Sequence, residues 1–477
     1  MNFIIEKLQS IKIHFKPFFR KNNVLLAIVA TILAVSWQEI NLGFLNNNAA
    51  VSHGMLTSGD EASYLCPPQN FLKEGEWRMS GKSPTSYFFR PPGLGLYFMA
   101  LTIFFGKNVW LAMKCANILL FFLSVVVFGK ILNLLPIPRK RIWLYLYALL
   151  PLYSGFLYFT ITEGISPSIV LFVIYFYLKL TKENKMLVWF IAMSAFLILL
   201  RPQLILLVLI MSAVLIYNKR KNLIVLLAFL PFVLWNVRSA RIAGEWLGVH
   251  PVYHVTNQGV WRPPHAALTN IYRQWEHKPD NLFKTIEILW SDTTVAAKNR
   301  ALQIVPEKYR QSVDTLFSEY QHIAFRQKLI MDTVLFNDYI WGEREFVAHA
   351  QKVIQQNKQH FPIDYYIVTP LQSAAFFFKS FLNLYIFQAP FRGNILCEIL
   401  RWICFLLVSF SVLSSFAVLF FPKKECFVFA LTIALTLFYF AFIQRMNEER
   451  YLYPLLPVAL LCFANLFSRG TRNNVYK

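Results

Sequence analysis

Residues 399–421 read ILRWICFLLVSFSVLSSFAVLFF, an apolar run whose only charged residue is Arg401. A helix needs roughly 18–20 apolar residues to cross the hydrocarbon core of a bilayer, and this run is longer. Two further runs, 142–159 and 164–180, approach or reach the same length. Lipid offers no hydrogen-bond partners to open backbone groups, so such runs must be helical. The sequence therefore predicts an all-α polytopic membrane protein.

The composition of the whole chain agrees with membrane insertion. Of its 477 residues, 56% are hydrophobic and only 15% are charged, whereas soluble domains carry about 25% charged residues. The net charge of +22 could indicate a nucleic-acid partner, but lysine and arginine cluster in short connectors at 139–141, 182–185, 219–221 and 423–424. Such clusters mark cytoplasmic loops. We therefore interpret the charge as a topology signal and expect no nucleic acid.

Placing the basic clusters in the cytoplasm predicts about 10–13 transmembrane helices, with both termini inside. Residues 1–237 form an N-terminal transmembrane module that includes a first outer loop at 38–92. Residues 238–370 contain no spanning run and form an extracytoplasmic loop region. Residues 371–477 begin with an interfacial helix at 371–388, because Lys379 interrupts its apolar run, and continue with the C-terminal transmembrane helices.

The first outer loop contains two groups of residues that suit chemistry on an anionic substrate. Asp60-Glu61, followed by Tyr64, offers carboxylates for a general base or a metal. Tyr87 precedes Arg90, which two prolines fix at the start of a short helix, where a guanidinium can bind a phosphate. Each group alone also has an interpretation without a catalytic role, because polar loops contain acidic residues and interfacial arginines contact lipid headgroups.

Three more ionisable residues fall at the outer ends of predicted helices. Glu163 lies at an outer turn, where it either joins a recessed site or is solvated. Arg201 breaks a run into two short arms and either enters a cavity or reaches the interface. Arg450, before Tyr451 at the start of the last helix, either binds the substrate or pairs with a neighbouring glutamate.

Taken together, these motifs resemble the GT-C membrane glycosyltransferases, in particular the branch of protein O-mannosyltransferases and lipid A aminoarabinose transferases. The resemblance rests on D-E-x-x-Y from Asp60, R-P-P from Arg90 and R-Y-x-x-P-x-x-P from Arg450. It implies a GT-C-like bundle with juxtamembrane helices on the outer face. It also implies that Asp60 is the catalytic carboxylate and that Arg90 contacts the donor phosphate. We expect Glu61 to assist Asp60, and Arg201 or Arg450 to assist Arg90.

The function that follows is an inverting transfer of sugar from a polyprenyl-phosphate donor to a lipid, glycan or protein acceptor. We expect it on the outer face of the cytoplasmic membrane. Glu163, Tyr64, Tyr87 and Tyr451 are further site candidates. Asp60, Glu61 and Glu163 could hold a magnesium or manganese ion, although the sequence does not require one. The competing interpretation is a transporter or flippase of a lipid-linked saccharide, which would also need helices and buried arginines.

Overall fold

The computed structural model describes residues 21–45, 51–57, 60–79, 90–217, 223–243, 263–276, 280–330, 342–380, 393–420, 424–445 and 449–467. Within these ranges the chain is mostly helical, with one short antiparallel pair of strands, β1 (Val51–Ser52) and β2 (Met55–Leu56). Five helical stretches there are long and apolar enough to cross a membrane: Asn23–Gly43, Gly93–Leu134, Leu223–Ile242, Ile395–Phe420 and Cys426–Gln444. The prediction of an all-α membrane protein is thus confirmed in class, while the larger number of crossings stays a prediction.

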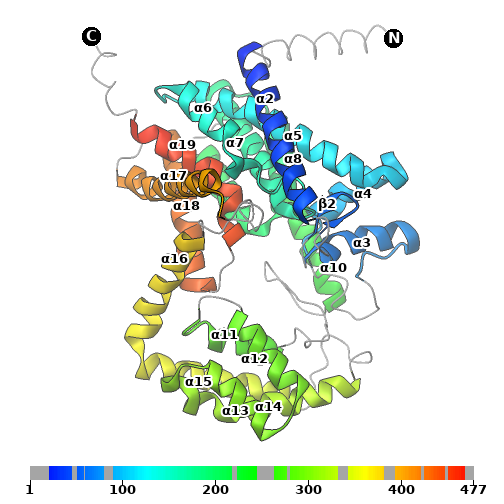
Figure 1. The fold of residues 1–477 in the computed structure, drawn as a ribbon, viewed down its shortest axis with the longest axis vertical. Helices are drawn as coiled ribbons and strands as arrows, with labels where there is room; N and C mark the ends of the chain where they lie inside the picture. Colours follow the sequence, from blue (N-terminus) through cyan, green and yellow to red (C-terminus); the bar gives the residue numbers. More distant parts are fainter. Residues whose placement is uncertain are drawn as a thin grey trace.

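The N-terminal helices form a bundle in which α5 and α8 pack against one largely buried helix (Figure 1). They are α2 (Lys21–Leu45), α3 (Glu61–Glu74), α4 (Gly93–Phe105), α5 (Val109–Leu134), α6 (Lys140–Leu149), α7 (Ser166–Glu183), α8 (Leu187–Leu200), α9 (Ile205–Tyr217) and α10 (Leu230–Ala243). The buried helix is α7, whose residues from Ser166 to Tyr175 are all shielded from solvent. In contrast, α2 exposes large apolar side chains such as Leu25 and Ile32 along its length. Exposed apolar surface on a long helix is what contact with lipid requires.

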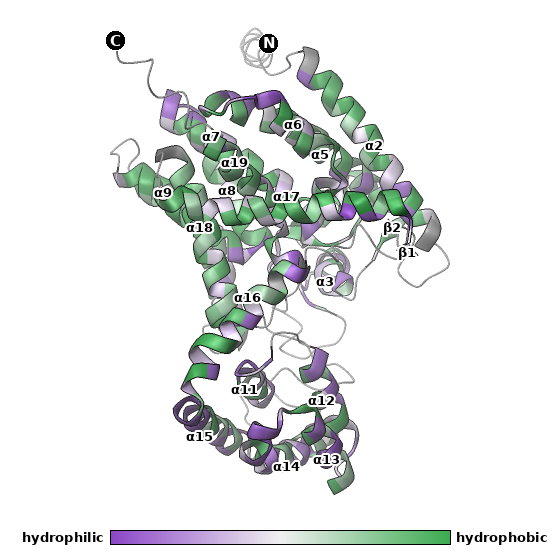
Figure 2. Cartoon of the chain, turned by 60° about the vertical axis from the view of Figure 1, so that its left-hand side comes forward, coloured by the Kyte–Doolittle hydropathy of each residue, from purple (hydrophilic) through white to green (hydrophobic). Residues whose placement is uncertain are grey.

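The C-terminal helices complete this apolar part. They are α16 (Thr369–Ser380), α17 (Ile395–Phe420), α18 (Lys424–Phe438) with its π-helical end η12 (Tyr439–Gln444), the 3-10 helix η13 (Glu449–Leu455) and α19 (Leu456–Leu466). In Figure 2, α17, α18 and α19 are predominantly hydrophobic in colour. Only the first part of the predicted interfacial helix at 371–388 is described, as α16, and it includes Lys379.

The expectation that 142–159 forms one spanning helix is wrong. Helix α6 ends at Leu149, and Pro151 begins a 3-10 turn, η4 (Pro151–Ser154). Proline cannot donate the hydrogen bond that would continue the helix. The chain then turns through Gly155 toward Phe159 and is almost entirely buried. This stretch is apolar because it lies inside the protein, and hydropathy alone does not distinguish that environment from lipid.

A second buried core lies inside the predicted loop region 238–370. It is formed by α11 (Pro263–Tyr272), α12 (Asp280–Ser291), α13 (Val295–Ile304), α14 (Glu307–Ile330) and α15 (Glu343–His360). We call these five helices the cap. They gather at one end of the molecule, away from α5 to α8 (Figure 1), and carry far more polar residues on their surface (Figure 2).

Arg445 joins the cap to the apolar helices. Its guanidinium lies 4.0 Å from the ring centre of Tyr365, in the π-helix η8 (Asp364–Val368) that leads into α16. Its backbone oxygen accepts a hydrogen bond from Ser373 at 2.7 Å, and its Nη1 donates to the backbone oxygen of Arg273 at 3.4 Å. One residue at the end of η12 therefore contacts α11's C-terminal turn, η8 and α16.

Candidate active site

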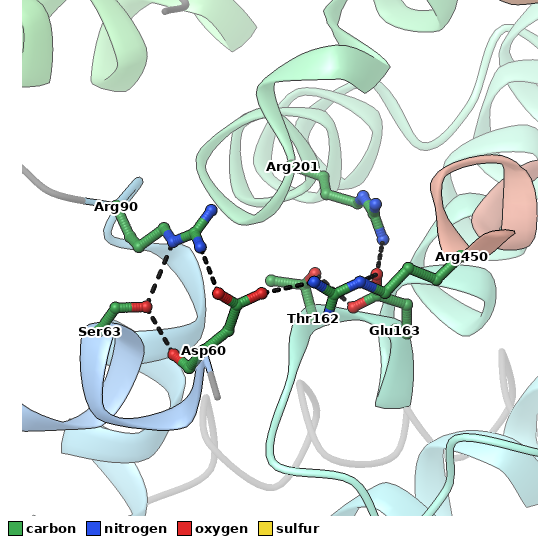
Figure 3. Close-up of polar contacts among 7 residues, drawn as sticks. All are labelled: Asp60, Ser63, Arg90, Thr162, Glu163, Arg201 and Arg450. Atoms are coloured by element: carbon green, nitrogen blue, oxygen red, sulfur yellow. Dashed lines mark hydrogen bonds and ion pairs between the residues drawn. The ribbon is translucent and has the colours of Figure 1, made fainter. Parts of the chain in front are cut away.

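Five charged residues from five connectors lie next to one another (Figure 3). Asp60 precedes α3, Arg90 precedes α4, Glu163 is in the 3-10 turn η5 (Thr162–Gly164) before α7, Arg201 follows α8, and Arg450 is in η13. They alternate in sign in the order Arg90, Asp60, Arg450, Glu163, Arg201. We call them the ion-pair chain.

At the more exposed end of the ion-pair chain, Asp60 lies between Arg90 and Arg450. Its Oδ1 lies 2.5 Å from Nη2 of Arg90, and its Oδ2 lies 2.5 Å from Nη2 of Arg450. An aspartate at a helix N-terminus usually caps the helix with its carboxylate, but Asp60 makes no such side-chain bond. Its backbone oxygen instead accepts from the amide and hydroxyl of Ser63, at 3.1 and 2.5 Å. The carboxylate is therefore available to pair with the arginines.

Arg90 is held by more than its ion pair. Its Nε donates to the hydroxyl of Ser63 at 3.2 Å, and its guanidinium lies 5.3 Å from the ring centre of Tyr64. The position of Arg90 follows from the packing of α4, because Gly93 lies against the backbone of Leu200 with no room for a Cβ. This close approach brings the start of α4 next to the turn that carries Arg201.

The other end of the ion-pair chain is closed to solvent. Nη1 of Arg201 lies 2.7 Å from Oε1 of Glu163, and the two side chains are 8% and 4% exposed. Oε2 of Glu163 accepts from the hydroxyl of Thr162 at 3.0 Å, while Nε of Arg450 is 3.8 Å from its Oε1. Glu163 is therefore shared between two guanidinium groups. Buried charges persist only when they are paired in this way.

The arginines also set the ionisation of Asp60. Its partial burial alone would raise the pKa of the carboxyl, but the charges of Arg90 and Arg450, with their hydrogen bonds, outweigh burial and hold the pKa below its usual range. Asp60 is therefore ionised at neutral pH. Glu61 differs, because burial raises its pKa despite a hydrogen bond from Thr160 at 2.5 Å and the nearby charge of His53.

The structure brings together five of the six charged residues selected from the sequence. Arg201 is buried against Glu163, and Arg450 contacts Asp60. Glu61 instead contacts Thr160, across from η5.

The tyrosine candidates have different positions. Tyr64 lies beneath Arg90. Tyr451 packs on Phe440, with ring centres 5.6 Å apart. Tyr87 lies outside the described residues.

Sequence reasoning missed the hydroxyl residues that support these charges. Ser63, Thr160 and Thr162 each bond a carboxylate, an arginine or the backbone of the site. The spacing D-x-x-S from Asp60 to Ser63 was a usable signal, because serine three residues after a helix start can reach back to it. Thr160 had no such local signal, since its partner Glu61 is 99 positions away.

No group of three metal-ligating side chains is found across the described ranges. Each carboxylate of the expected metal set has another partner: Asp60 has Arg90 and Arg450, Glu61 has Thr160, and Glu163 has Arg201. In this arrangement, the site presents guanidinium groups and is suited to bind an anion.

No protein-family model, curated protein or solved structure matches the chain.

Proposed function

We propose that this chain is a GT-C-type membrane glycosyltransferase, which moves a sugar from a polyprenyl-phosphate donor to a lipid, glycan or protein acceptor. The contact of Asp60 with Arg90 and Arg450 carries this proposal. These residues come from the three motifs on which the family resemblance rests. Asp60 and Arg450 are 390 positions apart and nevertheless touch. Contact between motifs so distant in sequence is expected if they form one site.

The charge of the ion-pair chain suits a donor with a single phosphate. Three arginines and two carboxylates leave a net charge of +1, and a phosphodiester-linked sugar carries one negative charge. After transfer, the lipid phosphate is a monoester that approaches two negative charges at neutral pH. By then the acceptor's proton has neutralised Asp60, so the site carries +2. Charge is balanced on both sides of the reaction.

In the proposed reaction, the acceptor oxygen attacks the anomeric carbon from the side opposite the phosphate and inverts it. The bond from that carbon to the phosphate oxygen breaks, and its electron pair stays on the phosphate. Asp60 takes the proton of the acceptor hydroxyl as general base. Arg90 and Arg450, backed by the Glu163–Arg201 pair, stabilise the charge that develops on the leaving phosphate.

The proposal includes a site on the extracytoplasmic face of the cytoplasmic membrane, within a bundle of about 10–13 crossings. Support comes from the order of the connectors. Those at 150–165, 201–204 and 445–455 hold Glu163, Arg201 and Arg450, and helices α7, α8, α9 and α18 link them to the basic connectors at 182–185, 218–222 and 422–424. Successive connectors of a membrane bundle lie on opposite sides, and the basic ones are cytoplasmic.

The experiment compares wild type with Asp60→Asn in membranes supplied with a panel of labelled polyprenyl-phosphate sugars and native membrane extract. We expect wild type to move label from the lipid to an acceptor and Asp60→Asn to lose at least about 100-fold in rate, because general bases contribute that much. Asp292→Asn is the matched control. It makes the same chemical change in the cap, where Asp292 pairs with the exposed Arg300, and it should keep full activity.

Three outcomes separate the alternatives. Full activity of a correctly inserted Asp60→Asn would remove Asp60 as the base. Equal loss in Asp292→Asn would indicate a general folding effect. Movement of labelled lipid across the bilayer by both variants, without sugar transfer, would favour the transporter interpretation.

A further inference from the structure

Both oxygens of the Asp60 carboxylate are engaged by guanidinium groups. Arg90 binds Oδ1 and Arg450 binds Oδ2, each at 2.5 Å. Charge-assisted hydrogen bonds are among the strongest in proteins. A carboxylate in this state has little tendency to accept a further proton. It also occupies the guanidinium groups that the proposed donor phosphate needs.

We propose that the Asp60 carboxylate occupies the place of the donor phosphate between Arg90 and Arg450. When a lipid phosphate binds, the two arginines contact the phosphate instead of Asp60. The carboxylate is then able to act as the base. This inference rests on the proposed function. It assigns to Asp60 a second role, in which it competes with the donor before it serves the acceptor.

The graded burial of the ion-pair chain favours an exchange at the Asp60 end. The side chain of Asp60 is 24% exposed, and those of Arg90 and Arg450 are 16% and 13% exposed. Glu163 and Arg201 are 4% and 8% exposed. An incoming anion can reach the first three groups, whereas the Glu163–Arg201 pair lies behind them.

The arginines have second contacts that would keep them in place during the exchange. Arg90 retains the hydroxyl of Ser63 and the ring of Tyr64. Arg450 retains Glu163, 3.8 Å from its Nε. Because these contacts do not involve Asp60, loss of the Asp60 ion pairs leaves both guanidinium groups at the site.

The exchange imposes an order on the reaction. Before the donor binds, the carboxylate is neutralised by two cations and is a poor base for an acceptor hydroxyl. Once the phosphate has accepted the two arginines, the same carboxylate faces the acceptor without them. Donor binding thus precedes acceptor activation, and part of the donor's binding free energy is used to separate the ion pairs.

The test measures binding of radiolabelled undecaprenyl phosphate to purified protein in nanodiscs. If Asp60 competes with the phosphate, Asp60→Asn should bind the lipid about tenfold more tightly than wild type, although it lacks transfer activity. Asp60→Ser should do the same, which guards against a new contact made by the asparagine amide. Undecaprenol, which lacks the phosphate, should bind all three proteins equally.

Glu61→Gln is the matched control, because it makes the same change from carboxylate to amide at the next residue. The Glu61 carboxylate contacts Thr160 and not an arginine. Its affinity should stay near that of wild type. Equal tightening in Glu61→Gln would reveal a general charge effect and overturn the inference. Unchanged or weaker binding by both Asp60 variants would overturn the exchange while leaving the donor proposal intact. Absence of phosphate-dependent binding in every protein would overturn both.

Discussion

Asp60 and Glu61 are adjacent carboxylates with opposite surroundings, and the start of α3 is the reason. Asp60 is the N-cap residue and points toward Arg90 and Arg450, whereas Glu61 is the first helical residue and points toward Thr160. One helical step is about 100°, so neighbours at a helix start face different partners. The pair D-E in the sequence therefore supplies one ion-paired acid and one acid with a raised pKa.

Glu61 gives a pH-dependent prediction at the residue scale. Because burial raises its pKa in the folded protein, the folded state holds the Glu61 proton more tightly than the unfolded state does. Ionisation then lowers stability as pH rises through that pKa. Glu61→Gln keeps an oxygen for Thr160 without the charge. We expect its thermal midpoint at pH 7 to exceed that of wild type by about 2 °C.

The difference should shrink as pH falls toward and below the usual glutamate pKa of about 4.3, where wild type is also neutral. Thermal unfolding of both proteins in nanodiscs at several pH values measures this. Glu287→Gln, at an exposed position on α12, should match wild type throughout. A midpoint difference that is the same at every pH would mean that the amide acts through packing and not through charge.

At the element scale, the contact between α4 and α8 fixes the distance between two of the arginines. A Cβ on Gly93 would overlap the backbone nitrogen and Cα of Leu200, directly before Arg201. We expect Gly93→Ala to separate the two helices and lower the thermal midpoint by several degrees, because overpacked contacts destabilise. Sugar transfer should fall with it, since Arg90 moves with α4.

Gly43→Ala in α2 is the natural control, since a Cβ there meets nothing within 4 Å. Alanine is the better helix former, so this variant should be unchanged or slightly more stable. A Gly93→Ala protein as stable and active as Gly43→Ala would show that the α4–α8 contact adjusts freely. Both variants can be compared by thermal unfolding and by the transfer assay.

Packing between elements separates what the sequence could predict from what it could not. Apolar runs and basic connectors predicted helices, the membrane class and which connectors hold charged residues. The motifs predicted Asp60, Arg90 and Arg450 as site residues. No local pattern specified that Asp60 would pair with Arg450, because that contact depends on how α3 and η13 pack. For the same reason, the sequence could not show whether the side chains of Asp60, Glu61 and Glu163 point toward one common metal ion.

At the scale of the whole molecule, the cap and the apolar helices have separate buried cores, and Arg445 contacts both parts. It stacks on Tyr365 and bonds Arg273 from the end of η12. We predict that Arg445→Met, which keeps the bulk of the side chain, loosens this joint. Amide hydrogen exchange should rise by about tenfold in η8 and the C-terminal turn of α11, with α3 unaffected.

Arg300→Met tests the specificity of that effect. Arg300 is 59% exposed and pairs with Asp292 at 3.3 Å, and such surface pairs contribute little to stability. Its exchange pattern should match that of wild type. Unchanged exchange in Arg445→Met would mean that the other contacts of α16 hold the cap without it.

The 390-position separation of Asp60 and Arg450 has a consequence for biosynthesis. During translation, the first acidic residues enter the membrane region long before η13 leaves the ribosome. Until then Asp60 lacks one guanidinium partner and the buried Glu163 lacks a neighbour that completes its surroundings. A nascent chain that stalls before η13 therefore contains two carboxylates that each have one guanidinium partner instead of two. Such a chain can bury its apolar helices and still present a recognisable defect to membrane quality-control proteases.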